Sequence, residues 1–535
     1  MSVVAVIGNG PVGATAALLL ARWGVPVVVL EAAPARTVVG SRSICQQRDV
    51  LDVWDSVGAG GIAAEGLTWT TARTYWRDRE LSAWRFVDRG ASPFPPFVNI
   101  SQSRTEQLLD AAVAAHPLAE VRWGHEVTGL VQDEQGVTLR CAGGQAVRAA
   151  YVLACPGPRG QAVRAAVGAR FDGETSPEQF LICDIRAELP GWADERRFYF
   201  DPPWNPGRQV LIHPCPEGTF RIDWQVPSDF DLAAAEAAGS VDQRIRAIIG
   251  ERRYELRWRS VYRFHSRVTD RMRVGRVLLA GDAAHVFAPF GARGLNSGVL
   301  DVENAAWKLA FVLRGWADQA LLDSYHQERH AAALENLAVT TATMRFLVPP
   351  DEPARRHRAD VLSRAATDPA ARALVDSGRF AEPFWYVDSP LTTPSSGRRF
   401  AGRPPRGEAP VPVPGVRLPD APVRLPGPAG PAGQPGRLAE LARAGLLVLV
   451  TDGVDRAGVA AAVAAATPAP SQVRALPELD QDGTVRAMLR ARPGEAWLVR
   501  PDGHIAAVLT SPEPATVTAA VRRSLALDRS AAPAA

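Results

Sequence analysis

Near its start the chain reads Val3-Val4-Ala5-Val6-Ile7-Gly8-Asn9-Gly10-Pro11-Val12-Gly13, an apolar run joined directly to three closely spaced glycines. The apolar run predicts a buried strand. Residues 12–23 predict a helix that ends at Gly24, and residues 25–30 predict a second strand that closes on Glu31. A Gly-x-Gly-x-x-Gly motif in this order of strand, turn, helix, strand and acid is typical of dinucleotide binding.

The residues of this motif, which we call the first fingerprint, have separate roles. Gly8 allows the tight turn, Gly10 lets a pyrophosphate approach the main chain, and Gly13 lets the helix pack closely on the strand. Pro11 and Val12 begin the helix, whose N-terminal N–H groups and partial positive charge attract phosphates. The acid at the end of the second strand is placed to accept hydrogen bonds from ribose hydroxyls. A plain glycine turn whose acid faces solvent is the alternative interpretation.

A second glycine signature lies far along the chain, in the segment Arg276-Val277-Leu278-Leu279-Ala280-Gly281-Asp282-Ala283-Ala284-His285. Asp282 follows a predicted buried strand and a glycine, where its carboxylate can bond the ribityl chain of a flavin. The following residues, Pro289-Phe290-Gly291-Ala292-Arg293-Gly294-Leu295-Asn296, form a loop that opens a helix. The N–H groups of that helix would stabilise negative charge on a reduced flavin ring. Together the two signatures predict one flavin dinucleotide; the alternative for the loop alone is a glycine-rich turn.

The composition is that of a globular protein with more than one domain. The chain has 535 residues, 47% of them hydrophobic and 22% charged, and its formal net charge is +3. This near balance, without a basic and aromatic-rich patch, argues against nucleic-acid binding. The five cysteines form no Cys-x-x-Cys pair and no His, Asp and Glu cluster has ligand spacing, so we expect no metal. No apolar stretch is long enough to span a membrane and no basic signal region precedes the first strand, so we expect a cytoplasmic protein.

Changes of pattern along the chain predict an α/β protein of several parts. Residues 1–170 and 266–400 are expected to form a Rossmann-like FAD-binding fold that ends in a helical segment. Residues 171–265 alternate as strands do and predict an inserted, mixed β-sheet substrate domain. The proline-rich residues 401–436 are expected to be an extended linker without helix or sheet. Residues 437–535 alternate helix and strand and predict a small α/β domain.

In their order the motifs resemble those of the FAD-dependent aromatic hydroxylases. These are single-component class A flavoprotein monooxygenases, typified by p-hydroxybenzoate hydroxylase and 3-(3-hydroxyphenyl)propionate hydroxylase. The resemblance covers residues 1 to about 400. The tail, with Ala496-Trp497-Leu498-Val499-Arg500-Pro501-Asp502-Gly503-His504, is similar to the thioredoxin-like C-terminal domain of the phenol hydroxylase branch but has no redox cysteines. We therefore expect the tail to be structural or to support a homodimer.

The resemblance implies further contacts with FAD. Arg42 and Arg48 match arginines that approach the flavin and its phosphates; without the resemblance they would be read as surface arginines. Gln102 and Arg104 match a segment that holds the ribityl chain and pyrophosphate, and the backbone of Val127 matches one that meets adenine. With the two signatures, the expected cofactor contacts are Gly8, Gly10, Pro11, Val12, Gly13, Glu31, Arg42, Arg48, Gln102, Arg104, Val127, Gly157, Asp282, Pro289, Gly291, Gly294, Leu295 and Asn296.

The resemblance also implies the reaction. NADH or NADPH would reduce FAD, O2 would give a flavin C4a-hydroperoxide, and an electron-rich aromatic small molecule, such as a phenol, would gain a hydroxyl group. The family's second fingerprint, an Asp-Gly pair with a following arginine, departs here: Pro156 replaces the acid before Gly157, while Arg159 and Arg164 remain. This departure leaves the nicotinamide preference open. The alternatives are a flavoenzyme of the same fold for epoxidation, Baeyer–Villiger-type insertion or oxidation, and a flavin-binding protein with little turnover.

The catalytic candidates are His213, Tyr262, Pro289 and Arg293. A phenol reacts faster as its phenolate, so we expect a proton acceptor or polar partner nearby, and His213, Tyr262 and His265 are the candidates. Pro289 belongs to the loop beside the flavin ring. Arg293 replaces a glutamine that is common in this loop, and its charge would favour an anionic reduced flavin.

Three aromatic residues have two interpretations each, and His285 has one. Phe220, Trp224 and Phe290 either line an aromatic substrate pocket or belong to the ordinary core of the sheet domain. His285 follows the second signature, and we expect it to pack near the flavin in a structural role.

Overall fold

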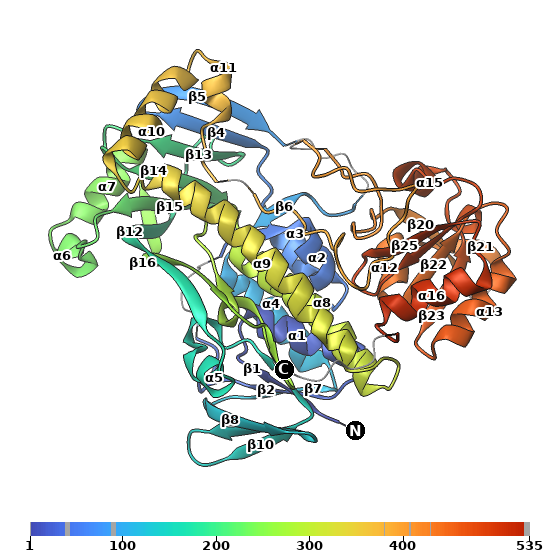
Figure 1. The fold of residues 1–535 in the computed structure, drawn as a ribbon. Coiled ribbons are helices and arrows are strands. Elements are labelled where there is room, and N and C mark those ends of the chain that lie inside the picture. Colours follow the sequence, from blue (N-terminus) through green and yellow to red (C-terminus); the bar gives the residue numbers. More distant parts are fainter. Residues whose placement is uncertain are drawn as a thin grey trace.

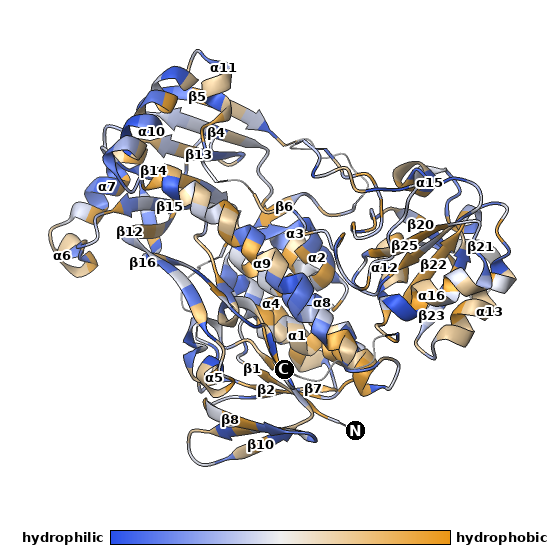
Figure 2. Cartoon of the chain, viewed as in Figure 1, coloured by the Kyte–Doolittle hydropathy of each residue, from blue (hydrophilic) through white to orange (hydrophobic). Residues whose placement is uncertain are grey.

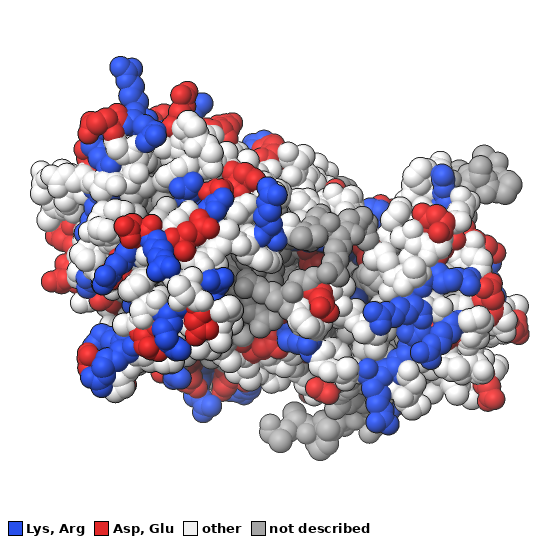
Figure 3. All heavy atoms as spheres, turned by 90° about the horizontal axis from the view of Figure 1, so that it is seen from above, with Lys and Arg blue, Asp and Glu red and all other residues white. Residues whose placement is uncertain are grey.

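The computed structural model describes residues 2–37, 43–86, 92–378, 380–405, 408–427 and 430–528. The expected FAD contact Arg42 lies outside the described residues. Two large sheets, several long helices and a separate C-terminal sheet make up the molecule (Figure 1). Acidic and basic side chains are interspersed over most of the face that Figure 3 presents.

The first fingerprint belongs to a six-stranded sheet. Its strands lie in the order β17-β18-β11-β1-β2-β7, and every neighbouring pair is parallel except β17 and β18. They are β1 (Val4–Ile7), β2 (Val27–Leu30), β7 (Ala119–Arg122), β11 (Tyr151–Ala154), β17 (Arg273–Val274) and β18 (Val277–Leu279). The strands β1, β2, β11 and β18 are buried along their whole length, because elements cover both faces of the sheet. The predicted strand-turn-helix-strand unit is therefore confirmed.

Helices and two small sheets surround this sheet. Helix α1 packs against α4 and α8, and its hydrophobic colouring in Figure 2 agrees with its burial. The helices of this part are α1 (Pro11–Arg22), α2 (Arg48–Asp55), α3 (Gly61–Glu65), α4 (Gln102–Ala115), α5 (Gln161–Ala166), α8 (Arg293–Leu313) and α9 (Ala320–Leu347), with the 3-10 turns η1 (Gly157–Arg159) and η3 (Gly281–Ala283). The small sheets comprise β8 (Val127–Asp133), β9 (Gly136–Cys141) and β10 (Ala146–Ala149), and β3 (Cys45–Gln47) with β6 (Phe97–Asn99).

The inserted sheet has eight strands in the order β19-β16-β12-β15-β14-β13-β4-β5. They are β4 (Thr71–Trp76), β5 (Arg79–Arg85), β12 (Phe171–Ala187), β13 (Glu195–Phe200), β14 (Gln209–Cys215), β15 (Thr219–Val226), β16 (Tyr254–Thr269) and β19 (His285–Val286). The long strands β12 and β16 run from this sheet to the FAD-binding part (Figure 1). The hairpin of β4 and β5 belongs to this sheet, because β4 pairs in parallel with β13. Its residues lie within 1–170, which were expected to belong to the FAD-binding part.

The two faces of the eight-stranded sheet are covered by different elements. One face packs on α6 (Leu232–Ala237) and α7 (Ser240–Ile249), next to the turn η2 (Pro216–Gly218). The other face packs on the residues around Phe290, the end of α9, and α10 (Glu352–Ala365), which α11 (Pro369–Ala373) follows. Phe220 and Trp224 lie on the first face and Phe290 on the second. The interpretation in which these three line one pocket is therefore wrong, because side chains on opposite faces of a sheet cannot meet.

The C-terminal part is a four-stranded sheet with helices on both faces. Its order is β23-β22-β24-β25, with β22 and β23 parallel and the other pairs antiparallel. The elements are α12 (Leu438–Arg443), β22 (Leu446–Val450), α13 (Arg456–Ala466), β23 (Ser471–Ala475), α14 (Leu476–Leu479), α15 (Thr484–Leu489), β24 (Glu495–Val499), β25 (Ile505–Thr510) and α16 (Pro514–Ser524).

The proline-rich segment differs from its expectation. The prolines of residues 401–436 predict an extended linker without helix or sheet. This prediction is wrong, because β20 (Pro422–Gly427) and β21 (Gly430–Arg437) pair as an antiparallel hairpin. A two-stranded ladder consists of edge strands, and an edge strand tolerates proline where its missing N–H would face outward. The hairpin leads directly into α12, so it belongs to the C-terminal part and is not a free linker.

Candidate functional site

The first fingerprint is built as its glycines require. Gly8 has φ 91°, and a Cβ atom on it would lie 2.5 Å from the carbonyl oxygen of Cys155. A Cβ on Gly13 would lie 1.9 Å from the carbonyl oxygen of Gly8, so helix α1 reaches the strand only because Gly13 has no side chain. A Cβ on Gly10 would meet nothing within 4 Å, and Gly10 is the N-cap of α1 without a side-chain cap. The open side of this turn fits a pyrophosphate at the helix N-terminus.

Glu31 is placed beside the first fingerprint. Its Oε2 accepts from the N–H of Asn9 at 2.7 Å and its Oε1 from the N–H of Ala33 at 2.9 Å. Each carboxylate oxygen has a second lone pair, so Glu31 can still accept from a ribose hydroxyl.

An arginine that the sequence analysis missed adjoins this group. Arg36 donates to the carbonyl oxygen of Asn9 at 2.6 Å and to both carboxylate oxygens of Asp110 at 2.7 Å. The side-chain amide of Asn9 also donates to Asp110, at 3.0 Å. The available signal was an arginine five residues after the acid of a βαβ unit, which alone does not separate a structural residue from a surface one.

The second signature packs directly on the first. Asp282 lies in η3, at the end of β18, and is half-buried. The N–H of Gly281 donates to Oδ2 of Asp301 at 3.0 Å. A Cβ atom on Gly298 of α8 would lie 2.7 Å from Cγ2 of Val12 and 3.1 Å from Cα of Gly281. The structure thus brings the two predicted FAD-binding segments together at the start of α1.

The loop Pro289–Asn296, which we call the flavin loop, is fixed by Asn296. The amide of Asn296 donates to the carbonyl oxygens of Cys45 at 2.9 Å and Ala292 at 2.6 Å, and it accepts from the N–H of Gln47 at 2.9 Å. Ala292 is held in the left-handed region, with φ 55° and ψ 43°, where it caps α8. Such strain in a non-glycine residue persists where the surroundings impose it and is common at binding sites.

Arg293, which belongs to the flavin loop and is the first residue of α8, is buried. Its guanidinium donates to Oδ1 of Asn336 at 2.5 Å and to the carbonyl oxygen of Phe380 at 3.2 Å. The N–H of Ala381 donates to the carbonyl oxygen of Gly291 at 2.9 Å, so residues around 380 cover this end of the loop. A contact of Arg293 with the flavin ring stays a prediction.

The arginines and the glutamine implied by the resemblance have defined partners. Arg48 begins α2 and donates to the carbonyl oxygen of Phe94 at 2.8 Å. Gln102 accepts from the N–H of Ser43 at 3.0 Å. Arg104 is 46% exposed and donates to both oxygens of Glu65, so a contact with FAD would have to compete with this ion pair.

The altered second fingerprint of the family lies between the two FAD-binding segments. The N–H of Cys155 donates to the carbonyl oxygen of Ile7 at 2.9 Å, so the next residue, Pro156, lies beside the first fingerprint. The guanidinium of Arg164 is buried and donates to the carbonyl oxygen of Ala283 in η3 at 3.1 Å. Gly157 has φ 66° and open space around it. Val127 begins β8 and is half-buried.

The catalytic candidates on the eight-stranded sheet share one face. His213 on β14 and Tyr262 on β16 both lie on the face that Phe290 of the flavin loop covers, and Tyr262 packs against Phe264 with ring centroids 5.8 Å apart. Burial, Arg196 and Arg221 lower the pKa of His213 well below its usual value. His265 lies further along β16, with its Nδ1 2.9 Å from the hydroxyl of Thr175.

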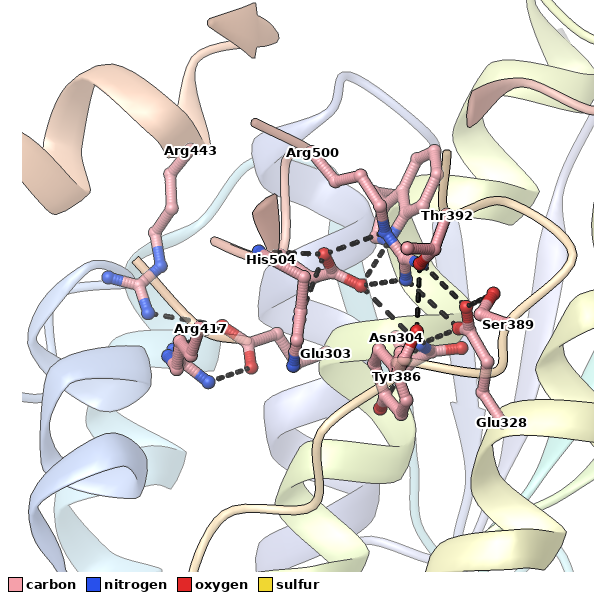
Figure 4. A network of polar contacts seen from close by, with 12 residues as sticks. Glu303, Asn304, Glu328, Tyr386, Ser389, Thr392, Arg417, Arg443, Arg500 and His504 are labelled. Atoms are coloured by element: carbon pink, nitrogen blue, oxygen red, sulfur yellow. Dashed lines mark hydrogen bonds and ion pairs between the residues drawn. The ribbon is translucent and has the colours of Figure 1, made fainter. Parts of the chain in front are cut away.

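A buried polar network connects the second signature with the C-terminal part. Figure 4 shows the portion of this network around Glu328, Tyr386 and Arg500. Asp301 binds Nε2 of His285 at 2.7 Å and Nε of Arg329 at 2.8 Å, and Arg329 donates to the hydroxyl of Tyr386 at 3.0 Å. His285 is fully buried in this network, in agreement with a structural role.

Glu328 is the next junction of the network. It accepts from Arg500 at 2.5 and 2.9 Å, from Lys308 at 2.6 Å and from Asn304 at 2.7 Å. Burial raises the pKa of Glu328, but the charges of Arg500 and Lys308 outweigh burial and lower it. Arg500 also binds Asp502, so the C-terminal part holds α8 and α9 through fully buried charges.

Two absences can be stated for the described parts of the chain. No helix there combines the length and the hydrophobicity that crossing a bilayer requires. No group of three or more His, Cys, Asp or Glu side chains is arranged there to hold a metal ion.

Comparisons with known proteins identify related families and relatives. Residues 1–340 match the family described as FAD binding domain, and residues 411–526 match the family described as aromatic-ring hydroxylase, C-terminal. Rifampicin monooxygenase of Streptomyces venezuelae is 35% identical over 357 residues, which cover 64% of this chain and 71% of that protein. The 3-(3-hydroxy-phenyl)propionate/3-hydroxycinnamic acid hydroxylase of Mycobacterium sp. (strain JLS) is 29% identical over 407 residues, covering 74% and 70%.

A solved structure extends the likeness in fold to the whole chain. The flavin-dependent monooxygenase PieE, in complex with FAD and substrate, superposes with a TM-score of 0.83 at 23% identity and covers 98% of this chain and 99% of that one. The family match covers both fingerprints and the glycine geometry fits the dinucleotide. The chain therefore belongs to the FAD binding domain family with an aromatic-ring hydroxylase C-terminal region, and it is an FAD-dependent monooxygenase.

Proposed function

We propose that the protein hydroxylates a phenol or a similarly electron-rich aromatic small molecule, using NAD(P)H and O2. The observation that carries this proposal is the position of the flavin loop on an aromatic sheet face. The ring centroid of Phe290 lies 5.7 Å from that of Phe180 and 6.0 Å from that of Phe264. An aromatic substrate held on this face would be adjacent to the flavin loop. The hydroxylases among the relatives support the same substrate class.

The protein's own residues position the reactants. When bound, FAD supplies the redox and oxygen-transfer chemistry. The first fingerprint and Glu31 would hold its pyrophosphate and ribose, and Asp282 its ribityl chain. The N-terminus of α8, fixed through Asn296, would place N–H groups and a partial positive charge at the ring. The aromatic face of the sheet would exclude water from the reacting atoms.

The test is a turnover screen of the purified holoenzyme. We expect a subset of a panel of phenols to stimulate oxidation of NADH or NADPH, with a product that gains one oxygen atom and keeps its aromatic ring. A peroxide assay separates hydroxylation from uncoupled oxidation. A product that has lost its aromatic ring through oxygen insertion, or stimulated oxidation that yields peroxide alone with every phenol, would contradict the proposal.

We also propose that residues 437–535 form a thioredoxin-like domain without redox function, which supports a homodimer. The strand order β23-β22-β24-β25, with its parallel pair and two antiparallel pairs, supports the thioredoxin-like interpretation. The boundaries at 170, 265, 400 and 436 belong to this proposal, with the hairpin of β4 and β5 added to the substrate domain. Light scattering at several protein concentrations tests the dimer, and a monomer throughout would contradict it.

A further inference from the structure

The sheet face beneath the flavin loop carries a group of charged and polar side chains in an otherwise apolar surface. Register places Arg221 of β15 opposite Asp184 of β12 and His213 of β14, and Asp223 lies on the same face of β15. Arg221 is buried and donates to both oxygens of Asp184 at 2.8 Å. The buried Arg196 of β13 lies near His213, and its positive charge contributes to the lowered pKa of that histidine. We call Asp184, Arg196, His213, Arg221 and Asp223 the sheet-face cluster.

Two members of this cluster have buried polar atoms that the fold does not satisfy. Among the described residues, no hydrogen-bond partner serves Oδ1 of Asp223 or Nδ1 of His213. Both amide atoms of Gln209, on the same face of β14, share this condition. Buried polar atoms in native proteins are nearly always paired, so several such atoms on one face point to a ligand with hydrogen-bonding groups.

The cluster adjoins the flavin loop. As whole residues, Asp223 and His213 are half-buried, although their unpaired atoms Oδ1 and Nδ1 are buried beneath the loop and helices that cover this face. Arg196 donates to the carbonyl oxygen of Ser377 at 2.8 Å. The next residue, Gly378, packs so closely on the flavin loop that a Cβ on it would lie 3.0 Å from Cβ of Phe290. The cluster is therefore joined to the loop through one short segment.

We propose that Asp223 binds the hydroxyl group of the aromatic substrate and removes its proton, with His213 as the second hydrogen-bonding partner of the same oxygen. This inference rests on the proposed function. In the proton transfer, the O–H bond of the substrate breaks and an O–H bond forms at Oδ1 of Asp223. The negative charge passes from the carboxylate to the phenolate oxygen, so the total charge is unchanged and no other reactant is needed. The cations of Arg221 and Arg196 remain close to that charge throughout.

The electrostatics of the face suit this role. Burial raises the pKa of Asp223; Arg221 lowers it, Asp184 raises it and Arg196 lowers it, and the result is about 7. A carboxylate with a raised pKa is a stronger base than an exposed carboxylate of ordinary pKa. With a pKa of about 7, a substantial fraction of the Asp223 side chains is ionised at neutral pH. His213 is neutral there because its pKa is lowered, so its imidazole can accept or donate without adding a charge. The remaining titratable group of β14 on this face is Cys215, whose pKa burial raises to about 12.

The test uses the FAD-loaded enzyme and two probes, 4-nitrophenol and its methyl ether 4-nitroanisole. The anion of 4-nitrophenol absorbs visible light at longer wavelength than the neutral phenol, so difference spectra report its ionisation on binding. Near pH 7, where Asp223 is ionised in about half of the molecules, wild-type enzyme is expected to bind 4-nitrophenol with a larger phenolate fraction than the free phenol has, and to bind 4-nitroanisole more weakly. Asp223→Asn is expected to bind it as the neutral phenol. The matched control is Asp172→Asn, a carboxylate on β12 that is 73% exposed, and it should behave as wild type.

A second measurement uses the wild-type enzyme alone, so it does not require that a variant folds. Near pH 7, where part of the Asp223 carboxyl groups are ionised, infrared difference spectra of wild-type enzyme should gain a carboxylic acid band when 4-nitrophenol binds. With any phenol that the enzyme hydroxylates, Asp223→Asn should lower kcat/KM about 100-fold and remove the acid limb of its pH profile. His213→Asn should weaken binding without abolishing ionisation.

The outcomes separate the two proposals. Unchanged phenolate formation in Asp223→Asn, absence of the acid band, or failure of the wild type to distinguish or bind the two probes would overturn the role of Asp223. Hydroxylation of a phenol together with any of those results would leave the proposed function standing. Loss of all turnover with the phenol panel would instead overturn the proposed function.

Discussion

A Cβ atom on Gly298 would lie 2.7 Å from Cγ2 of Val12, although Val12 belongs to the first fingerprint and Gly298 to the helix that follows the second signature far along the chain. Gly281 of η3 completes the contact, because the same Cβ would lie 3.1 Å from its Cα. Val12, Gly281 and Gly298 therefore set the distance between the start of α1 and the start of α8. That distance determines whether one dinucleotide can contact both segments.

Gly298→Ala should weaken FAD binding. Alanine ordinarily stabilises a helix relative to glycine by up to about 1 kcal/mol, but here overpacking costs about 1–3 kcal/mol. We expect a lower melting temperature and an FAD dissociation constant raised by about tenfold. Flavin fluorescence titration and thermal unfolding measure these changes. Gly129→Ala, where a Cβ meets nothing within 4 Å, is the control. A Gly298→Ala protein with wild-type FAD affinity would show that this contact does not position the cofactor.

Glu31→Gln should also weaken FAD binding. The carboxylate accepts from the N–H groups of Asn9 and Ala33, and a glutamine has only one acceptor oxygen to serve them. Leaving one N–H without its partner costs about 1–3 kcal/mol, which corresponds to about tenfold or more in affinity. Equilibrium dialysis against FAD measures it. Glu120→Gln on β7, whose carboxylate is 62% exposed and paired with Arg122, should retain wild-type affinity. Equal affinities in both variants would contradict the role of Glu31.

The parts of the fold that were predictable from sequence are those set by local pattern. The glycines of the first fingerprint, the apolar strands beside it and the helical segment that includes α9 are each specified by a short stretch of sequence. The face that holds Asp223 was not predictable. Strand β15 alternates Phe220, Arg221, Ile222 and Asp223, and such alternation ordinarily indicates one buried and one solvated face. Here both faces are covered, because the flavin loop and α9 pack on the second one.

Long-range pairing explains the other differences. The hairpin of β4 and β5 joins the sheet through β13, more than a hundred residues later in the chain, and no local signal specifies that partner. The same holds for Arg500, which directly follows β24 and binds Glu328 of α9, because no local signal specifies that partner. The hairpin of β20 and β21 forms despite its prolines because each strand has only one neighbour.

Arg500→Gln should destabilise the protein strongly. It would leave Glu328 and Asp502 buried beside each other without their common cation, and breaking a buried ion pair typically costs about 3–5 kcal/mol. Thermal and denaturant unfolding measure the loss. The control is Arg486→Gln, whose ion pair with Asp452 is 40% and 53% exposed and should be worth no more than about 1 kcal/mol. A loss in Arg500→Gln as small as that in the control would show that the network does not hold the C-terminal part.

The stability of the substrate-free enzyme should depend on pH through Asp223. Its pKa is raised from 3.8 to about 7 on folding, so between these values the folded protein binds more protons than the unfolded chain. The stability that Asp223 contributes is therefore lost as pH rises through this window. Asp223→Asn has no such titration, so its melting temperature relative to wild type should rise from pH 4 to pH 7 and level off above. Parallel curves for the two proteins would contradict the raised pKa.

The central claim is that one FAD molecule is bound by both fingerprints. Its most direct test is the flavin content of the purified protein, measured from the visible flavin absorption and from the nucleotide released on denaturation. We predict FAD in equimolar amount with the chain, and a marked loss of that content in Gly298→Ala and in Glu31→Gln. A colourless protein that takes up no added FAD would contradict the account.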